Sequence, residues 1–399
     1  MQIIEIGKLL IYEQPSKYIV KSTEYDDYYA IPVLTAGKTF ILGYTDETDN
    51  VFDKLPVIIF DDFTTATKYV DFKFKVKSSA MKILHINQEL VLPKYIFYRL
   101  QTINIDHSTH KRYWIQQYSK IKITIPITIP TIPEQEQIVK QIEESLSQLD
   151  SAVATLNKTK QQLEIYRQAV LKEAFQGKLS SHRPVSCSLS FLSSQESNNY
   201  PPIANEWKYI KLSCLGELAR GKSKHRPRND RKLFENGKYP FVQTGDVKKA
   251  DKYITDYENM YGDFGLQQSK LWKKGTLCIT IAANIAETAF LGMDACFPDS
   301  VVGFLPSEYV LPEYIRYFIE SQKVRLWAFA PATAQKNINL KTLENLVIPY
   351  CSIEEQAELI KIVDEKMSVC DRIKQVINQS LQQAEALRQS ILKQAFEGN

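Results

Sequence analysis

The stretch TIPEQEQIVKQIEESLSQLDSAVATLNKTKQQLEIYRQAVLKEAFQG at residues 131–177 decides the fold, because the chain contains it twice. Its second copy, SIEEQAELIKIVDEKMSVCDRIKQVINQSLQQAEALRQSILKQAFEG, covers residues 352–398. The copies align without a gap at an offset of 221, and 17 of the 44 positions from Glu134 to Gly177 are identical to their counterparts. A repeat with a period of about half the chain predicts a duplicated architecture.

Each copy is predicted to form one long helix. Both begin with a hydroxyl residue that has glutamate three places later, the pattern of a capping box, and both end at a glycine suited to the C′ position. Between the first turn and that glycine there is no Pro or Gly, and some 45 residues at 1.5 Å each give roughly 65 Å of helix. The capping and closing residues are Thr131, Glu134 and Gly177, then Ser352, Glu355 and Gly398.

A narrow apolar seam with heptad spacing runs along both helices, which is typical of a coiled coil. The first helix places Val139, Ile142, Leu146, Leu149, Val153, Leu156, Lys160, Leu163, Arg167, Val170 and Ala174 on it. The second places Ile360, Val363, Met367, Cys370, Lys374, Ile377, Leu381, Ala384, Arg388, Ile391 and Ala395 there. Each helix could instead bind another protein, but we expect the two to pair with each other in antiparallel fashion.

Composition sets further bounds. A chain of 399 residues predicts two to three domains, and 44% hydrophobic with 24% charged residues is ordinary for a globular protein. No run of 18 apolar residues predicts a membrane span, and the first residues do not form a signal peptide. The six cysteines are scattered without a metal-binding pattern, which favours a cytoplasmic protein without structural zinc.

The net charge of +4 is unevenly distributed. Residues 207–250 hold twelve Lys or Arg against four Asp or Glu, and residues 63–125 hold eleven against three. Residues 24–62 have the opposite balance, nine acidic against two basic. Local positive charge in a nearly neutral chain indicates a polyanionic partner.

The chain is therefore predicted to be α+β, with two globular α/β domains separated by two long helices in a pseudo-twofold tandem repeat. We expect a first globule at 1–130, a helix at 131–178, a Ser-, Asn- and Pro-rich linker at 179–206, a second globule at 207–350 and a helix at 351–399. In the first globule, β-like runs occur at 3–6, 29–34, 57–61, 69–76 and 81–86. The helical stretch VLPKYIFYRLQ at 91–101 returns as VLPEYIRYFIE at 310–320.

The sequence matches to catalytic and cofactor-binding motifs lack the neighbouring residues that those functions require. GELARGKS at 216–223 matches a phosphate-binding loop, but the polar stretch KHRPRNDRK that follows cannot open the helix which that chemistry needs. YPPI at 200–203 follows no strand, so it does not indicate a methyltransferase. His107 and His110 lack further metal ligands nearby, and Asp61 with Asp62 lacks the Glu-x-Lys of a nuclease.

The residues we expect at a DNA surface are cations and hydroxyl or amide side chains near strand ends, which contact phosphates and base edges respectively. Solvated loops and turn capping are the competing explanations. The candidates are Arg220, Lys222, Lys224, Arg226, Arg228, Arg231, Lys232, Gln243, Thr244 and Asn284 in the second globule, and Thr64, Thr65, Lys68, Lys73 and Lys75 in the first.

The chain resembles the specificity subunit of type I restriction–modification enzymes over essentially its whole length. The resemblance rests on the paired helix starts at 129–135 and 348–356, the paired RQ-x-x-LK-x-AF-x-G ends, Trp207–Leu212, YPFVQTGDV at 239–247 and the VLPEYI helix. The first globule departs from the family by lacking a W-x-x-x-x-L start, and its acidic 24–62 stretch is awkward for DNA contact.

The resemblance implies a non-catalytic, DNA-binding subunit in which each globule is a target recognition domain for half of a split sequence. It implies that the helices set the spacer and dock two methyltransferase subunits, with a restriction subunit as a further partner. S-adenosylmethionine and ATP would bind those partners, and this chain would hold no cofactor. The alternatives are a two-headed coiled-coil adaptor without DNA specificity, or the reading subunit of a related fused methylase–nuclease system.

Overall fold

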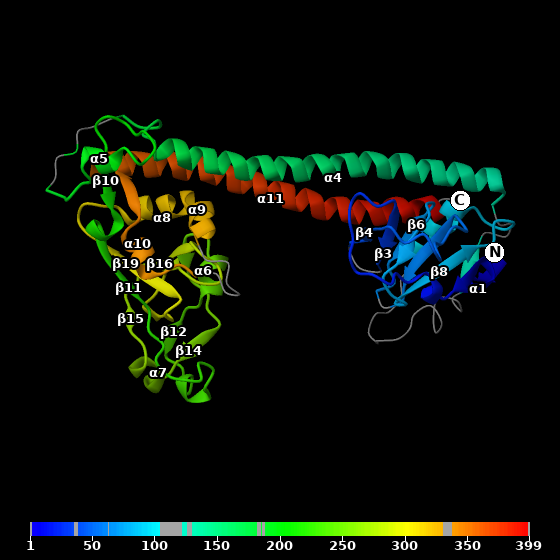
Figure 1. Cartoon of the computed structure of the whole chain (residues 1–399), viewed down its shortest axis with the longest axis horizontal. Coiled ribbons are helices and arrows are strands. Elements are labelled where there is room, and N and C mark those ends of the chain that lie inside the picture. The colour runs from blue at the N-terminus through cyan, green and yellow to red at the C-terminus, as the bar shows by residue number, and fades with distance from the viewer. Residues whose placement is uncertain are drawn as a thin grey trace. The chain divides into compact units, whose positions relative to one another are not determined.

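The computed structural model describes residues 2–35, 39–62, 64–103, 122–125, 130–181, 185, 188–329 and 337–397. It divides into two compact units, Met1–Lys158 with Ile377–Asn399, and Thr159–Val376. Each unit contains one globule and a segment of both long helices (Figure 1). Within the described residues, no helix is both long enough and apolar enough to cross a membrane.

The first globule is built on small sheets covered by short helices. Its helical elements are α1 (Ile6–Leu9), η1 (Pro15–Tyr18) and α2 (Pro93–Gln101). Its strands are β1 (Gln2–Glu5), β2 (Leu10–Glu13), β3 (Ile31–Leu34), β4 (Ile41–Thr45), β5 (Val57–Asp61), β6 (Thr67–Val70), β7 (Lys75–Val76), β8 (Met81–Ile86) and β9 (Lys122–Ile125). The sheet orders are β2-β8-β5-β6, β4-β3-β7 and β1-β9.

The second globule contains a larger version of the same sheets. Its helical elements are α5 (Ser194–Ser197), η3 (Leu212–Cys214), η4 (Arg231–Leu233), α6 (Thr244–Lys249), α7 (Asp263–Gln267), α8 (Pro312–Ser321), α9 (Lys323–Phe329) and α10 (Leu340–Glu344). Its strands are β10 (Lys208–Lys211), β11 (Gly216–Arg220), β12 (Tyr239–Phe241), β13 (Tyr253–Ile254), β14 (Asn259–Tyr261), β15 (Leu271–Trp272), β16 (Leu277–Thr280), β17 (Thr288–Leu291), β18 (Ala295–Cys296), β19 (Val301–Pro306) and β20 (Val347–Tyr350). The sheet orders are β11-β19-β16-β17-β13, β14-β12-β18-β15 and β10-β20.

The two globules share one topology. The order β2-β8-β5-β6 corresponds to β11-β19-β16-β17, and β4-β3-β7 corresponds to β14-β12-β18. In the three-stranded sheet of the first globule, β3 pairs antiparallel with β4 and parallel with β7. In the corresponding sheet of the second globule, β12 pairs antiparallel with β14 and parallel with β18. The second globule adds β13 and β15 at sheet edges. The duplication predicted from the helices therefore extends through both globules, although their sequences have diverged.

The long helices are α4 (Ile132–Ala174) and α11 (Ile353–Glu397), the green and red helices of Figure 1. In the first unit, the start of α4 packs against the end of α11 through Ile142, Leu146 and Leu392. In the second unit, Val170 and Ala174 near the end of α4 join the core that includes Leu359 and Val363 from the start of α11. The predicted antiparallel pairing is confirmed.

The predicted seam matches the buried side of both helices. Leu146, Leu149, Leu163, Met367 and Ile377 are buried, while Val153, Leu156, Leu381 and Ile391 are half-buried. Two interhelical ion pairs are repeat equivalents of each other. Arg167 binds Asp371 in the second unit, and Arg388 binds Asp150 in the first, so each partner is displaced by 221 residues from its counterpart.

A buried glutamine joins each long helix to the short helix of its globule. Gln356 is 0% exposed. Its Oε1 accepts from the Leu311 N–H (2.9 Å), and its Nε2 donates to the carbonyls of Cys351 (3.0 Å) and Tyr309 (3.3 Å). Because Leu311 is the N-cap of α8, the first of these bonds satisfies an N–H that the helix itself leaves unpaired.

The first unit repeats this arrangement. Gln135, also 0% exposed, accepts from the N–H of Leu92, the N-cap of α2 (2.7 Å). It donates to the carbonyls of Pro130 (2.9 Å) and Leu90 (3.4 Å). We call Gln135 and Gln356 the latch glutamines.

The phenylalanine of each AF-x-G ending packs on a tyrosine of a globule. Phe175 meets Tyr314 edge to face, with ring centroids 5.0 Å apart, and Phe396 meets Tyr95 in the same way at 5.3 Å. The first helix closes at Gly177, whose φ of +72° favours glycine and whose added Cβ would lie 2.7 Å from the Ala204 Cβ. Each globule therefore holds the start of one long helix and the end of the other.

The predicted linker is not a free segment where it is described. Leu189, Phe191 and Ile203 pack against the core of the second unit. The Ser180 hydroxyl donates to the Glu355 carboxylate (2.8 Å), which also accepts from the Trp207 indole (3.0 Å). Apolar residues spaced among the Ser and Asn explain this, because they bury side chains that a disordered linker would expose.

Candidate nucleic-acid interface

A cationic loop connects β11 to β12 in the second globule. Its sequence has no apolar periodicity, so it forms neither a strand nor a long helix, and it is held by its own polar contacts. Gly221 begins it against the sheet, where an added Cβ would lie 2.2 Å from the Phe297 carbonyl oxygen. The Arg226 guanidinium donates to the Ser223 carbonyl (2.6 Å). His225 Nε2 lies 2.7 Å from the Asp230 carboxylate.

The charge of this loop faces solvent. Hydrogen bonds from the His225 ring and from the Lys232 N–H lower the pKa of Asp230, so the one acid within 220–232 stays ionised and internally bound. Among the described residues, no ion pair engages most of the loop cations. Arg220 at the end of β11 and the predicted cations of the loop are all exposed: Lys222, Lys224, Arg226, Arg228, Arg231 and Lys232. The loop can therefore offer several phosphate contacts at once.

The polar residues predicted to contact base edges, Gln243, Thr244 and Asn284, follow strands β12 and β16. Gln243 is exposed just after β12, where its N–H donates to the Asp246 carboxylate (2.8 Å), and Thr244 begins α6. These two residues line one hollow of about 520 Å³ together with Arg228 of the cationic loop. Asn284 lies outside the lining of that hollow, and its Oδ1 accepts from Lys248 (3.3 Å). Sequence reasoning missed Asn229 and Asn259, which line the hollow too.

In the first globule, the predicted residues are divided between surface and interior. Thr64 is exposed in the turn after β5, where its hydroxyl donates to the Asp61 carboxylate (2.6 Å), and Thr65 follows it with a φ of +63°. Lys68 and Lys73 are exposed. Lys75 is not: only 1% of its surface is exposed. The prediction that Lys75 contacts DNA is therefore wrong.

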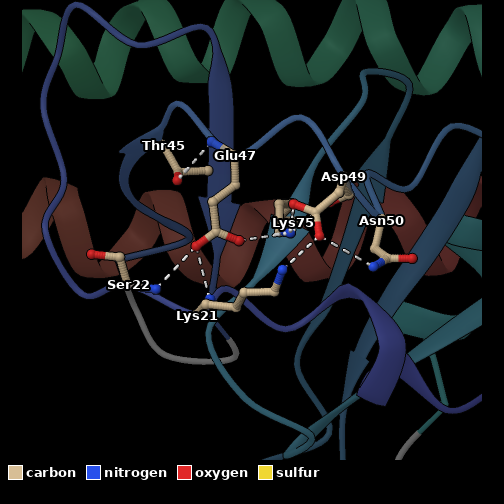
Figure 2. A network of polar contacts seen from close by, with 7 residues as sticks. All are labelled: Lys21, Ser22, Thr45, Glu47, Asp49, Asn50 and Lys75. Atoms are coloured by element: carbon tan, nitrogen blue, oxygen red, sulfur yellow. Dashed lines mark hydrogen bonds and ion pairs between the residues drawn. The ribbon is translucent and has the colours of Figure 1, made fainter.

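Figure 2 shows what Lys75 does instead. Its Nζ lies 2.8 Å from the Glu47 carboxylate and donates to the Asp49 carbonyl (2.7 Å). Glu47 also accepts from the N–H groups of Lys21 (2.8 Å) and Ser22 (3.0 Å), and these bonds, led by that from Lys75, lower the pKa of Glu47. Lys75 thus neutralises part of the acidic 24–62 stretch from within. The ion pair reduces the net negative charge of that stretch, and so the electrostatic repulsion that it would exert on DNA.

The rejected motifs have structural roles. Gly216–Arg220 of the phosphate-loop match is strand β11, and the cationic loop follows it. Asp61 and Asp62 are buried, and Asp62 lies 3.8 Å from Lys82. In the part of the chain that the structure describes, no group of His, Cys, Asp and Glu is arranged to hold a metal. His107 and His110 lie outside the described residues.

Comparisons with known proteins agree on one family. The family profile described as "Type I restriction modification DNA specificity domain" matches residues 205–383. The specificity subunit of the type I restriction enzyme EcoR124I/EcoR124II from Escherichia coli is 33% identical, covering 90% of this chain and 85% of that one. The MjaVIII specificity subunit from Methanocaldococcus jannaschii is 24% identical over 100% of this chain and 92% of that one.

The fold has a counterpart among solved structures. A chain from a structure of the type I R-M system superimposes with a TM-score of 0.70 at 16% identity, covering 100% of this chain and 97% of that chain. At that identity, the likeness concerns the fold alone.

Proposed function

The chain belongs to the specificity subunits of type I restriction enzymes, and on that premise we propose that its two globules each read one half of a bipartite DNA target. As a member of this family it is a non-catalytic subunit for sequence-specific DNA recognition. The observation that carries the bipartite reading is the repeated topology: each half of the chain supplies one globule of the same fold. Divergent side chains on a shared fold suit two different half-sites.

The paired helices act as a spacer in this proposal. A helix of 43 residues such as α4 measures about 65 Å, or about two turns of B-DNA. The latch glutamines support a fixed spacing, because buried hydrogen bonds join each helix to its globule. The bases between the half-sites would then go unread.

The helices also carry a surface suited to partner proteins. In the second unit the ion pairs Glu164–Lys374 and Arg167–Asp371 lie on one flank of the helix pair. At 100° per residue, four apolar side chains that are 39–60% exposed fall on the opposite flank. They are Tyr166, Val369, Ile373 and Val376. We call these four residues the apolar flank.

We assign the apolar flank to a methyltransferase subunit, because exposed apolar clusters mark interaction surfaces. The repeat-equivalent positions in the first unit are Gln148, Ala152, Thr155 and Leu387, which are mostly polar or small, so the apolar flank accounts for one methyltransferase subunit. We infer a second methyltransferase subunit from the duplication of the helices. A restriction subunit completes the assembly, with S-adenosylmethionine and ATP bound by the partners. Such a complex acts on chromosomal DNA, so we place it in the cytoplasm.

The spacer proposal is tested by lengthening both helices. Inserting seven residues, one heptad, at equivalent positions of α4 and α11 preserves the seam and adds about 10 Å, or about three base pairs. Mapping methylated bases in cells should then show a longer spacer between unchanged half-sites. The same seven residues inserted after Asn198, in the segment before β10, serve as the control and should leave the spacer unchanged.

An unaltered spacer in a folded, methylating helix variant would refute the spacer proposal. Loss of methylation together with loss of co-purification with the methyltransferase would refute the premise that insertion preserves the helix pair. Circular dichroism separates this case from general unfolding.

A further inference from the structure

The hollow beside the cationic loop gathers polar side chains from distant parts of the second globule. It measures about 520 Å³ and is partly open to solvent. Arg228 and Asn229 come from the loop, Gln243 follows β12, Asn259 begins β14, and Ser300 precedes β19. Phe241 is the opposite partner of Asn259 in the β12–β14 ladder, and both residues line the hollow.

Two of its carboxamides are unengaged. Among the described residues, the side chains of Asn229 and Asn259 have no hydrogen-bond partner. Asn229 is exposed, so solvent can satisfy its carboxamide, whereas Asn259 is half-buried. A carboxamide brings both donors and an acceptor, and a half-buried one without a partner is costly unless water or a ligand satisfies it. The side chain of Gln243 is exposed at the same hollow. The carboxamides of Asn229, Gln243 and Asn259 therefore give the hollow both hydrogen-bond donors and acceptors.

Arg228, the arginine that lines the hollow, already forms an ion pair. Arg228 Nη2 donates to both oxygens of Asp299, at 2.9 and 3.0 Å. This contact fixes the guanidinium at the hollow and neutralises a carboxylate that would otherwise repel a polyanion. Arg228 is therefore less available than the carboxamides for recognition of a base edge.

We propose that this hollow is the base-reading site of the second globule, and that Gln243 and Asn259 are specificity-determining residues, each of which recognises one adenine of the half-site. The proposal rests on the proposed function, in which this globule contacts DNA. Adenine presents a donor at N6 and an acceptor at N7 in the major groove, and the carboxamide of Asn or Gln matches both. The exposed cations of the loop, such as Lys222 and Lys224, would hold the flanking phosphates.

The test is a methylation assay on DNA libraries with randomised half-sites, using the full chain assembled with its methyltransferase. Gln243→Ala or Asn259→Ala should lower discrimination at one A·T position by about 5- to 150-fold, the range for loss of a bidentate base contact. The other half-site should stay unchanged. Gln243→Glu, which removes the donors, should shift preference at that position from adenine towards cytosine.

Lys222→Ala is the matched control, because an exposed phosphate contact should weaken methylation of all sequences alike. The proposal is overturned if the Gln243 and Asn259 variants keep full selectivity, or if they lose activity uniformly as Lys222→Ala does. Should an alanine variant misfold, Gln243→Glu at its exposed position still decides the outcome. If the wild-type chain itself imposes no sequence preference, the proposed function fails and not only this assignment.

Discussion

Replacing a latch glutamine tests whether the junction between globule and long helix is held by buried polar contacts. Gln356→Ala would leave the Leu311 N–H and the Cys351 carbonyl without their partner, in a site that is 0% exposed. Each unpaired buried group costs about 1–3 kcal/mol, and the lost side-chain volume adds to this. We expect the second unit to lose about 3–5 kcal/mol of unfolding free energy.

Urea denaturation followed by circular dichroism measures this loss. Gln383→Ala, at an exposed position on the same helix, is the matched control and should change stability by less than about 0.5 kcal/mol. Gln135→Ala should destabilise the first unit to a similar extent, because its bonds are equivalent. If Gln356→Ala is no more harmful than Gln383→Ala, the latch does not stabilise the junction.

Three further predictions concern charge and partner binding. Hydrogen bonds from Lys17, His85 and Tyr18 outweigh burial and lower the pKa of Glu13 to about 2, so this carboxylate stabilises the first unit above pH 4.5. That stability, about 1–3 kcal/mol, should vanish as pH falls from 4.5 to 2, and Glu13→Gln should flatten the pH dependence of urea unfolding over this range. Ile373→Glu in the apolar flank should reduce co-purification of the methyltransferase, whereas Thr155→Glu, at the repeat-equivalent of Val376, should reduce it less; equal losses would contradict the assignment. Reversing the charge of Lys222 and Lys224 should weaken DNA binding and reduce the slope of log K against log salt by about one for each phosphate that is no longer bound, as read by fluorescence anisotropy at several salt concentrations.

The sequence predicts the helical scaffold well because its signals are local and repeated. Heptad spacing, caps and a 44-residue gapless alignment define both long helices and their buried seam. The short strands β2 and β4 were not predicted, since four or five mixed residues carry little period-two signal. Their place is set by pairing with β8 and β3, which depends on the rest of the globule.

The candidate site is only partly predictable, for a related reason. Exposure of the 220–232 cations follows from a polar stretch that cannot pack, so the sequence indicates it. Lys75 has the same alternating neighbours as exposed Lys73, and only the contact with Glu47, 28 residues away, reveals that it is buried. Asn229 and Asn259 had no motif to mark them, because their significance arises when separate loops meet at one hollow.

The two interhelical ion pairs have a consequence for how such a chain could have arisen. Arg167–Asp371 and Arg388–Asp150 are the same ion pair formed once in each half of the repeat. The hydrogen bonds of the latch glutamines and the phenylalanine–tyrosine contacts are likewise repeated in both halves. In a half-length ancestor, the same residues would meet across a twofold axis as an isologous homodimer. Such a dimer would read two identical half-sites in a palindrome. Fusion of two copies would then free each globule to diverge and allow an asymmetric target.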